Sequence, residues 1–157
     1  MASPADAAQI ADAHLDSIHS LGAKAYAPDV VAVWGAPRDI ERYKSAMESD
    51  QVFYVAVATG PTADRVLGFS SHRVEDGRHR TAIYVRGDAA RMGVGTALFQ
   101  AAETTAHEQG ASEIHVDASL AAVEFYKSLG FEPLGIGQHR LSSGMLMDCV
   151  FMRKTLP

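Results

Sequence analysis

The chain has 157 residues, a length typical of one domain, and we expect residues 1–157 to fold as a single unit. Hydrophobic residues make up 47% and charged residues 21%, a balance that excludes wholesale disorder. The 14 Lys and Arg side chains are outnumbered by 19 Asp and Glu, giving a net charge of −5. This charge argues against nucleic acid as the main partner, because phosphate binding needs a basic face.

Membrane insertion and disulfide bonding are not expected either. No apolar run approaches the ~20 residues that span a bilayer, and residues 1–14 lack the basic flank and apolar core of a signal peptide. Cys149 is the only cysteine, so it has no partner for an internal disulfide and no further thiolates for a zinc site. These features favour a reducing, cytoplasmic location and a protein without a metal.

Two helices are expected in the first third of the chain. Residues 4–21 place apolar side chains at helical spacing, with Ser3 as the N-cap. A second helix is expected over residues 39–47. The segment between them, which holds Tyr26 and Trp34, is expected to be irregular.

The remainder of the chain alternates between strands and helices. Apolar residues at helical spacing predict helices over residues 94–109 and 120–129, each followed by a glycine. Short β-rich runs predict strands over residues 52–58, 66–74, 79–85, 113–116, 131–139 and 145–154. This order predicts a mixed α/β fold with helices around one sheet.

A glycine-containing loop follows the strand that ends at Val85. Gly93 and Gly95 stand at the entrance of the next helix, where free N–H groups and the helix dipole form an anion site. Two nucleotide motifs fail here, because a P-loop needs a lysine where Thr96 stands and a dinucleotide fingerprint needs a glycine in place of Leu98. On their own, the two glycines are explained equally well by an anion site and by a tight strand-to-helix turn without a ligand.

A second segment runs from the strand ending at Val116 into the helix over residues 120–129. The apolar face of this helix includes Phe125 and Tyr126, and such aromatic pairs more often pack in a core than take part in chemistry. A buried tyrosine still needs a partner for its hydroxyl. A phenol with a pKa near ~10 is a suitable acid for a departing thiolate.

Together the two segments resemble the motifs of the GNAT superfamily of acetyl-CoA-dependent N-acetyltransferases. The last four positions of the first motif, Gln/Arg-x-x-Gly-x-Gly/Ala, are matched by residues 92–95. The second motif, Asn-x-x-Ala-x-x-Phe-Tyr-x-x-x-Gly-Phe, is matched at Ala122, Phe125, Tyr126, Gly130 and Phe131. The order of elements fits nearly the whole chain, so the resemblance implies a mixed, mostly antiparallel central sheet flanked by helices.

The resemblance also implies acetyl-CoA as co-substrate. N–H groups of residues 92–97 would hold the coenzyme A pyrophosphate, and the strand edge ending at Val85 would pair with the pantetheine arm. Tyr126 would lie near the thioester sulfur and protonate the leaving thiolate. The implied coenzyme A site comprises Val85, Arg91, Met92, Gly93, Val94, Gly95, Thr96, Ala97, Ser119 and Tyr126.

Three departures from the family pattern affect these expectations. Ala90 stands where the first motif begins with Gln or Arg, and Arg91 follows one place later. Ser119 replaces the usual Asn and keeps only a hydroxyl. The family's first strand normally precedes the first helix, and only residues 1–3 are available for it, so this strand is expected to be vestigial, absent or lost to a misplaced start.

An ammonium substrate must lose a proton before its nitrogen can attack. Many family members keep a glutamate on the strand before the glycine loop, but residues 79–85 contain none. Strand parity places His79 on the same face as Val85, and histidine suits base chemistry near neutral pH, so His79 is the first candidate for the base. Alternatively, His79 is a solvent-exposed residue just beyond a turn and has no role in catalysis. The other candidates are His72, Asp117 (which alternatively caps the following helix), His139 and a water chain.

Tyr26 and Trp34 lie where the family's first helices cover the acceptor pocket. They would either form an aromatic wall for an amine or simply pack the helices against the sheet. The implied reaction is acetyl transfer to a primary amine of a small molecule or peptide, by direct attack in a ternary complex. The alternative is a non-catalytic acyl-CoA-binding protein on the same fold. The tail strands are candidates for a homodimer interface.

Overall fold

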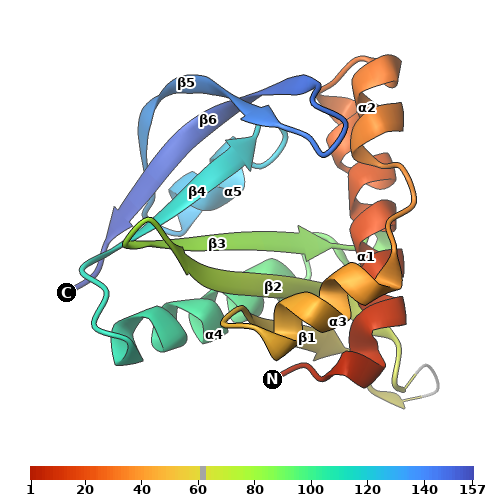
Figure 1. Ribbon diagram of the computed structural model, residues 1–157, viewed down its shortest axis with the longest axis horizontal. Helices are drawn as coiled ribbons and strands as arrows, with labels where there is room; N and C mark the ends of the chain where they lie inside the picture. Colours follow the sequence, from red (N-terminus) through yellow and green to blue (C-terminus); the bar gives the residue numbers. More distant parts are fainter. Residues whose placement is uncertain (61–62) are drawn as a thin grey trace.

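A twisted six-stranded sheet runs through the computed structural model, which describes residues 1–60 and 63–157 (Figure 1). The strand order is β1-β2-β3-β4-β6-β5. β3 and β4 pair in parallel and the other neighbours pair antiparallel, which confirms the expected mostly antiparallel sheet. The strands are β1 (Val52–Val57), β2 (Val66–Glu75), β3 (Arg78–Val85), β4 (Glu113–Ser119), β5 (Glu132–Arg140) and β6 (Leu146–Thr155).

Helices cover both faces of this sheet. The α-helices are α1 (Ala7–Ser20), α2 (Pro28–Trp34), α3 (Ile40–Glu48), α4 (Val94–Glu108) and α5 (Val123–Ser128), and 3-10 turns occupy Pro4–Asp6, Gly22–Lys24 and Gly87–Ala89. Phe69 of β2 packs with α1 and α3, whereas the hydroxyl of Ser70 donates to the Leu98 carbonyl in α4. Since adjacent strand residues point to opposite faces, α1 and α4 lie on opposite sides of β2. None of the described helices is long and apolar enough to cross a membrane.

No strand precedes α1 among the described residues, which is one of the outcomes that the sequence allowed. The N–H of Ser3 donates to the Asp6 carboxylate at 2.8 Å, which starts the 3-10 turn that leads into α1. In place of a strand, the N–H of Ala2 donates to the Phe53 carbonyl at 2.8 Å. One backbone hydrogen bond thus remains along the free edge of β1.

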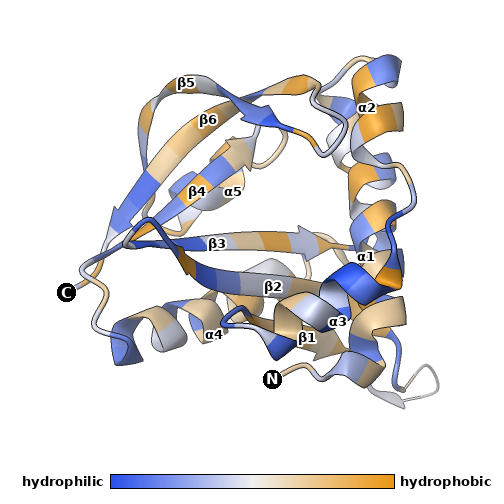
Figure 2. Ribbon diagram, viewed as in Figure 1, coloured by the Kyte–Doolittle hydropathy of each residue, from blue (hydrophilic) through white to orange (hydrophobic). Residues whose placement is uncertain are grey.

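Helix α2 was not predicted, and its composition explains why. It has seven residues, and its three valines have low helix propensity because they are β-branched. Pro28 at its first position and Asp29 in its first turn are the start signals. Its apolar residues, orange in Figure 2, include Val31 and Trp34, which pack with Leu141 and other residues of the β5–β6 hairpin. Tertiary packing therefore stabilises a helix that propensity alone disfavours.

The elements around the second motif also differ from expectation. β4 extends to Ser119 rather than ending at Val116, because its pairing with β6 continues to Cys149. Asp117 consequently lies inside the strand and does not cap α5. Helix α5 starts at Val123 rather than 120, since the N–H of Ala122 donates to the Ser119 carbonyl in an intervening turn.

The two halves of the sheet separate between β3 and β4. Their ladder contains two pairs only, His79 with Ile114 and Arg80 with His115. Beyond these pairs the strands diverge (Figure 1). Along the described chain, the β3 edge over residues 81–85 therefore has no strand partner on the β4 side. The backbone groups of alternate residues along this edge face the opening, and those of the others face β2.

Candidate active site

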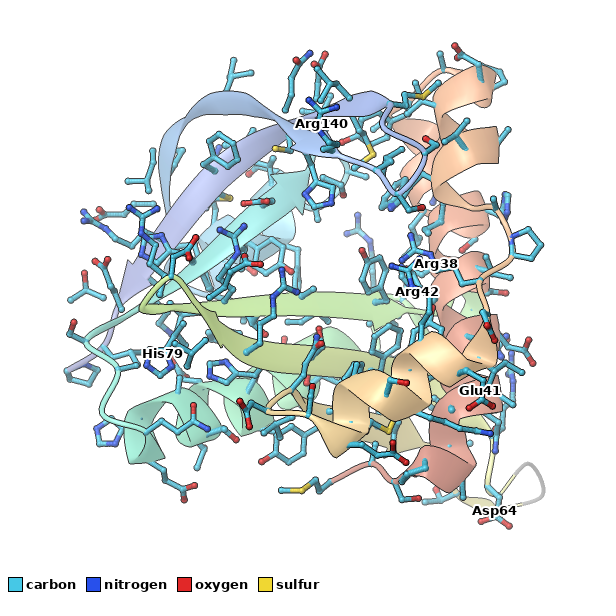
Figure 3. All side chains as sticks on the ribbon, viewed as in Figure 1. Arg38, Glu41, Arg42, Asp64, His79 and Arg140 are labelled. Carbon is cyan, nitrogen blue, oxygen red and sulfur yellow. The ribbon has the colours of Figure 1, made fainter. Side chains whose placement is uncertain are left out.

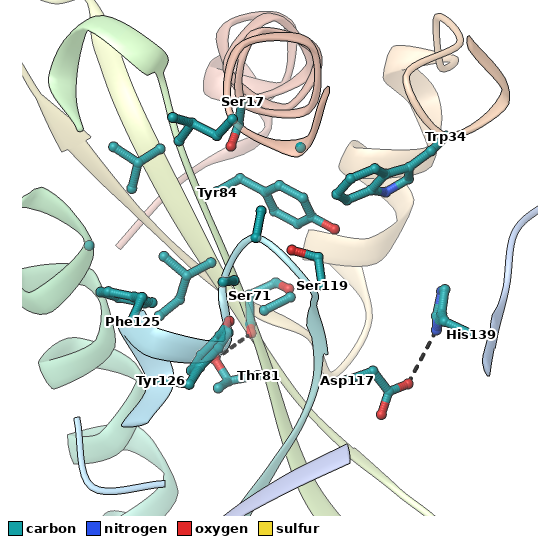
Figure 4. A pocket seen from close by; sticks show the side chains of 18 of the residues that line it. Ser17, Trp34, Ser71, Thr81, Tyr84, Asp117, Ser119, Phe125, Tyr126 and His139 are labelled. Carbon is teal, nitrogen blue, oxygen red and sulfur yellow. Dashed lines mark hydrogen bonds and ion pairs between the residues drawn. The ribbon is translucent and has the colours of Figure 1, made fainter. Parts of the chain in front are cut away.

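A cleft of about 1310 Å³ opens where β3 and β4 diverge (Figure 4). Its walls come from α1, α2 and α3 on one side, from the entrance of α4 and from α5 on another, and from the end of β5. Of the residues singled out in the sequence, it is lined by Trp34, Val85, Arg91, Gly93, Gly95, Thr96, Asp117, Ser119, Tyr126 and His139.

The entrance of α4 is built to attract an anion. Gly93 is the N-cap with φ +81°, a left-handed conformation that glycine adopts without strain, and no side chain of the described residues caps the helix. The N–H groups of residues 94–96 are thereby left for a ligand, at the positive end of the helix dipole. The N–H of Ala97 already donates to the Gly93 carbonyl at 3.0 Å, so Ala97 drops out of the expected donors, residues 92–97.

Gly95 is needed for a reason that the sequence motif does not reveal. A Cβ atom at this position would lie 2.9 Å from the ring of Phe125 and 3.6 Å from Val85. The first turn of α4 therefore packs directly against α5. Gly95 joins the two motif segments, and the aromatic ring of the second motif occupies the space that a side chain would need.

Tyr126 is buried at the floor of the cleft, with 5% of its surface exposed. Its ring packs edge-on against Phe131 at 5.3 Å between centroids. Burial is the main cause that raises the pKa of Tyr126 well above its ordinary value, and the nearby Tyr84 adds to the rise. The phenol consequently stays protonated across the working pH range and can donate a hydrogen bond into the cleft.

Coenzyme A fits the groups present here. A pyrophosphate needs N–H donors and positive potential, which the uncapped start of α4 and Arg91 offer. An amide-containing arm needs an unpaired strand edge, which residues 81–85 offer in the gap. These two features lie on the same cleft as Tyr126.

Tyr26 and Trp34 have different positions. Trp34 lines the cleft, whereas Tyr26 is not among the lining residues. The Tyr26 hydroxyl accepts a hydrogen bond from the Leu120 N–H at 2.8 Å and donates one to the Asp148 carbonyl at 2.6 Å. Tyr26 therefore ties the segment before α2 to β6 and to the turn after β4, and its ring meets Trp34 edge-on at 5.6 Å.

His79 and His72 lie outside the cleft. His79 Nδ1 is 3.2 Å from His72 Nε2, which is also 3.2 Å from the side-chain oxygen of Gln109 at the end of α4. His79 shares a strand face with Val85, as expected, but six residues at ~3.3 Å each put it about 20 Å away. Figure 3 shows His79 at the start of β3, far from Arg38 and Arg42. Neither histidine lines the opening in which the β3 edge is free.

Asp117 and His139 meet inside the cleft (Figure 4). His139 Nδ1 lies 3.2 Å from Asp117 Oδ2, and Arg80 forms an ion pair with Oδ1 of the same carboxylate at 2.5 Å. The hydrogen bond with His139 and the charge of Arg80 hold the pKa of Asp117 below its usual value despite partial burial. Asp117 is thus a carboxylate that orients an imidazole whose Nε2 has no hydrogen-bond partner among the described residues. Sequence parity did not single out this pair, because its residues come from β4 and β5.

The charge of the cleft is opposite to that of the whole chain. Seven of the 14 Lys and Arg residues line it, but only two of the 19 acidic residues, Asp117 and Glu124. The cationic residues are Lys24, Arg38, Arg42, Arg73, Arg80, Arg91 and Arg140. A basic cleft in an acidic protein favours anionic ligands.

Comparison with known proteins agrees with this geometry. Residues 23–156 match the family model described as an acetyltransferase (GNAT) domain. No curated protein matches the chain at a significant level. A solved protein from Rhodopseudomonas palustris, described as a GCN5-related N-acetyltransferase (Aminotransferase, Class-II), is 30% identical with a TM-score of 0.84, over 99% of this chain and 92% of its own.

Two more distant structures share the fold. The PaiA N-acetyltransferase from Thermoplasma acidophilum in complex with coenzyme A is 15% identical, with a TM-score of 0.71 over 99% of this chain and 96% of its own. YncA, a putative acetyltransferase from Salmonella typhimurium with its cofactor acetyl-CoA, is 20% identical, with a TM-score of 0.71 over 99% and 91%. At these identities, the likeness concerns the fold.

The chain belongs to the GNAT acetyltransferase family. The expected family, fold and enzyme class are thereby confirmed: the protein is an acyltransferase of a family that uses acetyl-CoA for acetyl transfer. The comparisons favour this enzyme over the non-catalytic acyl-CoA-binding protein on the same fold.

Proposed function

We propose that the protein transfers the acetyl group of acetyl-CoA to a primary amine by direct attack in a ternary complex. One observation carries the proposal: the uncapped start of α4, the unpaired edge of β3 and the buried hydroxyl of Tyr126 all belong to one cleft. The three features supply, in order, an anion site, a backbone template and a proton donor.

Coenzyme A recognition is assigned to backbone groups and one cation. The N–H groups of residues 94–96 hold the pyrophosphate, and Arg91, with φ +63°, contributes positive charge beside them. The β3 edge that ends at Val85 pairs with the pantetheine arm. Ser119, at the end of β4, lies on the opposite side of the gap and offers a hydroxyl.

Tyr126 stabilises the departing sulfur. The amine nitrogen forms a bond to the acetyl carbon, the carbon–sulfur bond breaks, and its electron pair leaves on the sulfur of coenzyme A. Because the raised pKa of Tyr126 makes it a weak acid, its main contribution is a hydrogen bond that strengthens as negative charge develops on sulfur. The proton that the thiolate finally takes up comes from this phenol or from solvent.

His139 removes the proton from the attacking amine. It lines the cleft, its Nδ1 is held by Asp117, and its Nε2 has no partner among the described residues. A carboxylate that holds one ring nitrogen fixes the tautomer and stabilises the imidazolium that forms. His79 and His72 are not carried into this proposal, because they lie away from the cleft.

The test is acetylation of a panel of amines. Purified protein is mixed with acetyl-CoA and small amines, amino acids, polyamines or short peptides, and thiol release is measured with product masses. We expect thiol release that depends on the amine, with an added mass of one acetyl group. Absence of transfer to every amine, together with no binding of acetyl-CoA by calorimetry, would refute the proposal.

A further inference from the structure

Coenzyme A accounts for only part of the positive charge in the cleft. Its pyrophosphate is assigned to the start of α4, where Arg91 lies. Arg38 and Arg42 line the same cleft from the opposite wall, from the segment between α2 and α3 and from the first turn of α3. Figure 3 shows them close together between α3 and the end of β3.

Tyr84 connects these arginines to the reaction centre. Its ring lies on β3 and lines the cleft (Figure 4). Tyr84 is near enough to raise the pKa of Tyr126, and Arg38 is near enough to lower the pKa of Tyr84 against the larger effect of burial. An acceptor whose amine reaches the sulfur beside Tyr126 can therefore extend past Tyr84 to the arginines.

Among the cleft arginines, Arg73 and Arg80 have carboxylate partners, whereas Arg38, Arg42, Arg91 and Arg140 form no ion pair with the described residues. Arg73 pairs with Glu75, and Arg80 pairs with Asp117 and Glu75. Within the part of the chain that the structure describes, neither Arg38 nor Arg42 forms an ion pair, and the one side-chain hydrogen bond of Arg38 goes to the Trp34 carbonyl at 3.3 Å. Arg38 is half-buried and Arg42 is exposed. A partly buried guanidinium without an anion, as at Arg38, is costly, and a ligand carboxylate would offset that cost.

We propose that Arg38 and Arg42 bind an anionic group of the acceptor. The acceptor is then an amine that also carries a carboxylate or a phosphoryl group, as in an amino acid or an aminoalkyl phosphonate. Both groups present oxygens that match the planar fork of a guanidinium. This inference rests on the proposed acetyl transfer and adds the substrate class to it.

The experiment compares matched acceptors on the same carbon skeleton. Amino acids, their amides and the corresponding aminophosphonates are tested with the wild type, Arg42→Gln, Arg42→Lys and Arg38→Gln. Arg65→Gln is the matched control, because Arg65 pairs with Asp88 and does not line the cleft. Binding of N-acetyl amino acids and of their amides to the coenzyme A complex is measured in parallel by calorimetry.

We expect the wild type to favour an anionic acceptor over its amide at least 10-fold in kcat/KM. Arg42→Gln and Arg38→Gln should lose 10- to 100-fold with anionic acceptors only, Arg42→Lys should recover part of this, and Arg65→Gln should behave as wild type. The carboxylate and phosphonate arms identify the preferred anion.

Equal rates with acids and amides, or equal losses with both in the variants, would overturn the inference while acetyl transfer stands. Weaker acetyl-CoA binding by the Arg42→Gln protein would also overturn it and assign this arginine to coenzyme A. If no amine is acetylated, the binding arm still decides: unselective binding of N-acetyl amino acids and amides contradicts an anion subsite.

Discussion

Nδ1 of His139 and Oδ2 of Asp117 lie 3.2 Å apart inside the cleft, although 22 residues separate them in the chain. We predict that His139→Gln lowers kcat/KM by ~10²-fold or more, because general base catalysis is typically worth ~10²–10⁴-fold. Amines of low pKa should recover part of the rate, since they need less help to lose a proton. The measurement is kcat/KM against pH for amines of graded pKa.

His79→Gln is the matched control for this prediction. It makes the same substitution on a histidine outside the cleft, so the pH profile should remain that of the wild type. Asp117→Asn should fall between the two, because it keeps the shape but removes the charge that orients His139. A parental pH profile in His139→Gln across all amines would leave water as the base.

Tyr126→Phe should lower kcat by ~10²–10⁴-fold and leave the acetyl-CoA dissociation constant nearly unchanged. The substitution keeps the ring that packs on Phe131 and removes only the hydroxyl. Tyr54→Phe serves as control, because its hydroxyl bonds Thr105 outside the cleft. An unchanged kcat in Tyr126→Phe, with chemistry shown to limit the rate, would mean that Tyr126 has only a packing role.

Gly95→Ala should destabilise the protein by ~1–3 kcal/mol, the usual range for overpacking. Alanine normally favours a helix, but here its Cβ would lie 2.9 Å from the Phe125 ring. Adding Phe125→Leu should recover part of the loss, which a double-mutant cycle in urea detects as coupling. Additive effects of the two substitutions would show that the ring is not what excludes a side chain.

His14 should make the protein sensitive to acid. It is buried and bonded to Tyr43 at 2.7 Å, and burial, aided by the charge of Arg38, lowers the pKa of His14 to about 3. Below its usual pKa near 6.5, the unfolded chain takes up a proton that the folded chain does not. The contribution of neutral His14 to the free energy of unfolding is therefore full above pH ~6.5 and is lost as the pH falls toward 3. Between pH 7 and pH 5 the loss is about 2 kcal/mol.

The measurement is the free energy of unfolding in urea at several pH values. His14→Gln cannot take up this proton, so its free energy should vary less between pH 7 and pH 5 than that of the wild type. Parallel curves for the two proteins would mean that His14 is not the group responsible.

The sequence predicts elements and motifs well where local physics decides them. Glycine spacing at Gly93 and Gly95 predicts the start of α4, and the Asp76-Gly77 turn, with φ values of +50° and +72°, joins β2 to β3 as expected. Helix α2 was missed because packing on the β5–β6 hairpin, rather than propensity, holds it. This packing is a long-range effect that no local pattern reports.

The residue that takes the proton from the amine could not be identified from the sequence, for the same reason: local patterns do not report long-range contacts. Parity along one strand correctly groups His79 with Val85, but it cannot say how far along the strand the cleft extends. The Asp117–His139 pair and the two arginines come together only when β4, β5 and the α2–α3 segment are placed in space. The charge of the cleft was likewise hidden, because the net charge of the whole chain is −5 whereas the charged residues that line the cleft are mostly basic.

Binding of coenzyme A at the start of α4 is tested by the Thr96→Asp variant. Thr96 is exposed in the first turn, where a carboxylate favours the helix by ~0.3–1 kcal/mol but repels a pyrophosphate. Thr104→Asp is the control, because it places the same charge farther along the same helix. Calorimetry with acetyl-CoA should show at least 10-fold weaker binding to Thr96→Asp, and the thermal stability of this variant should be unchanged. Thr104→Asp should bind acetyl-CoA with wild-type affinity. Equal affinities in all three folded proteins would contradict the account.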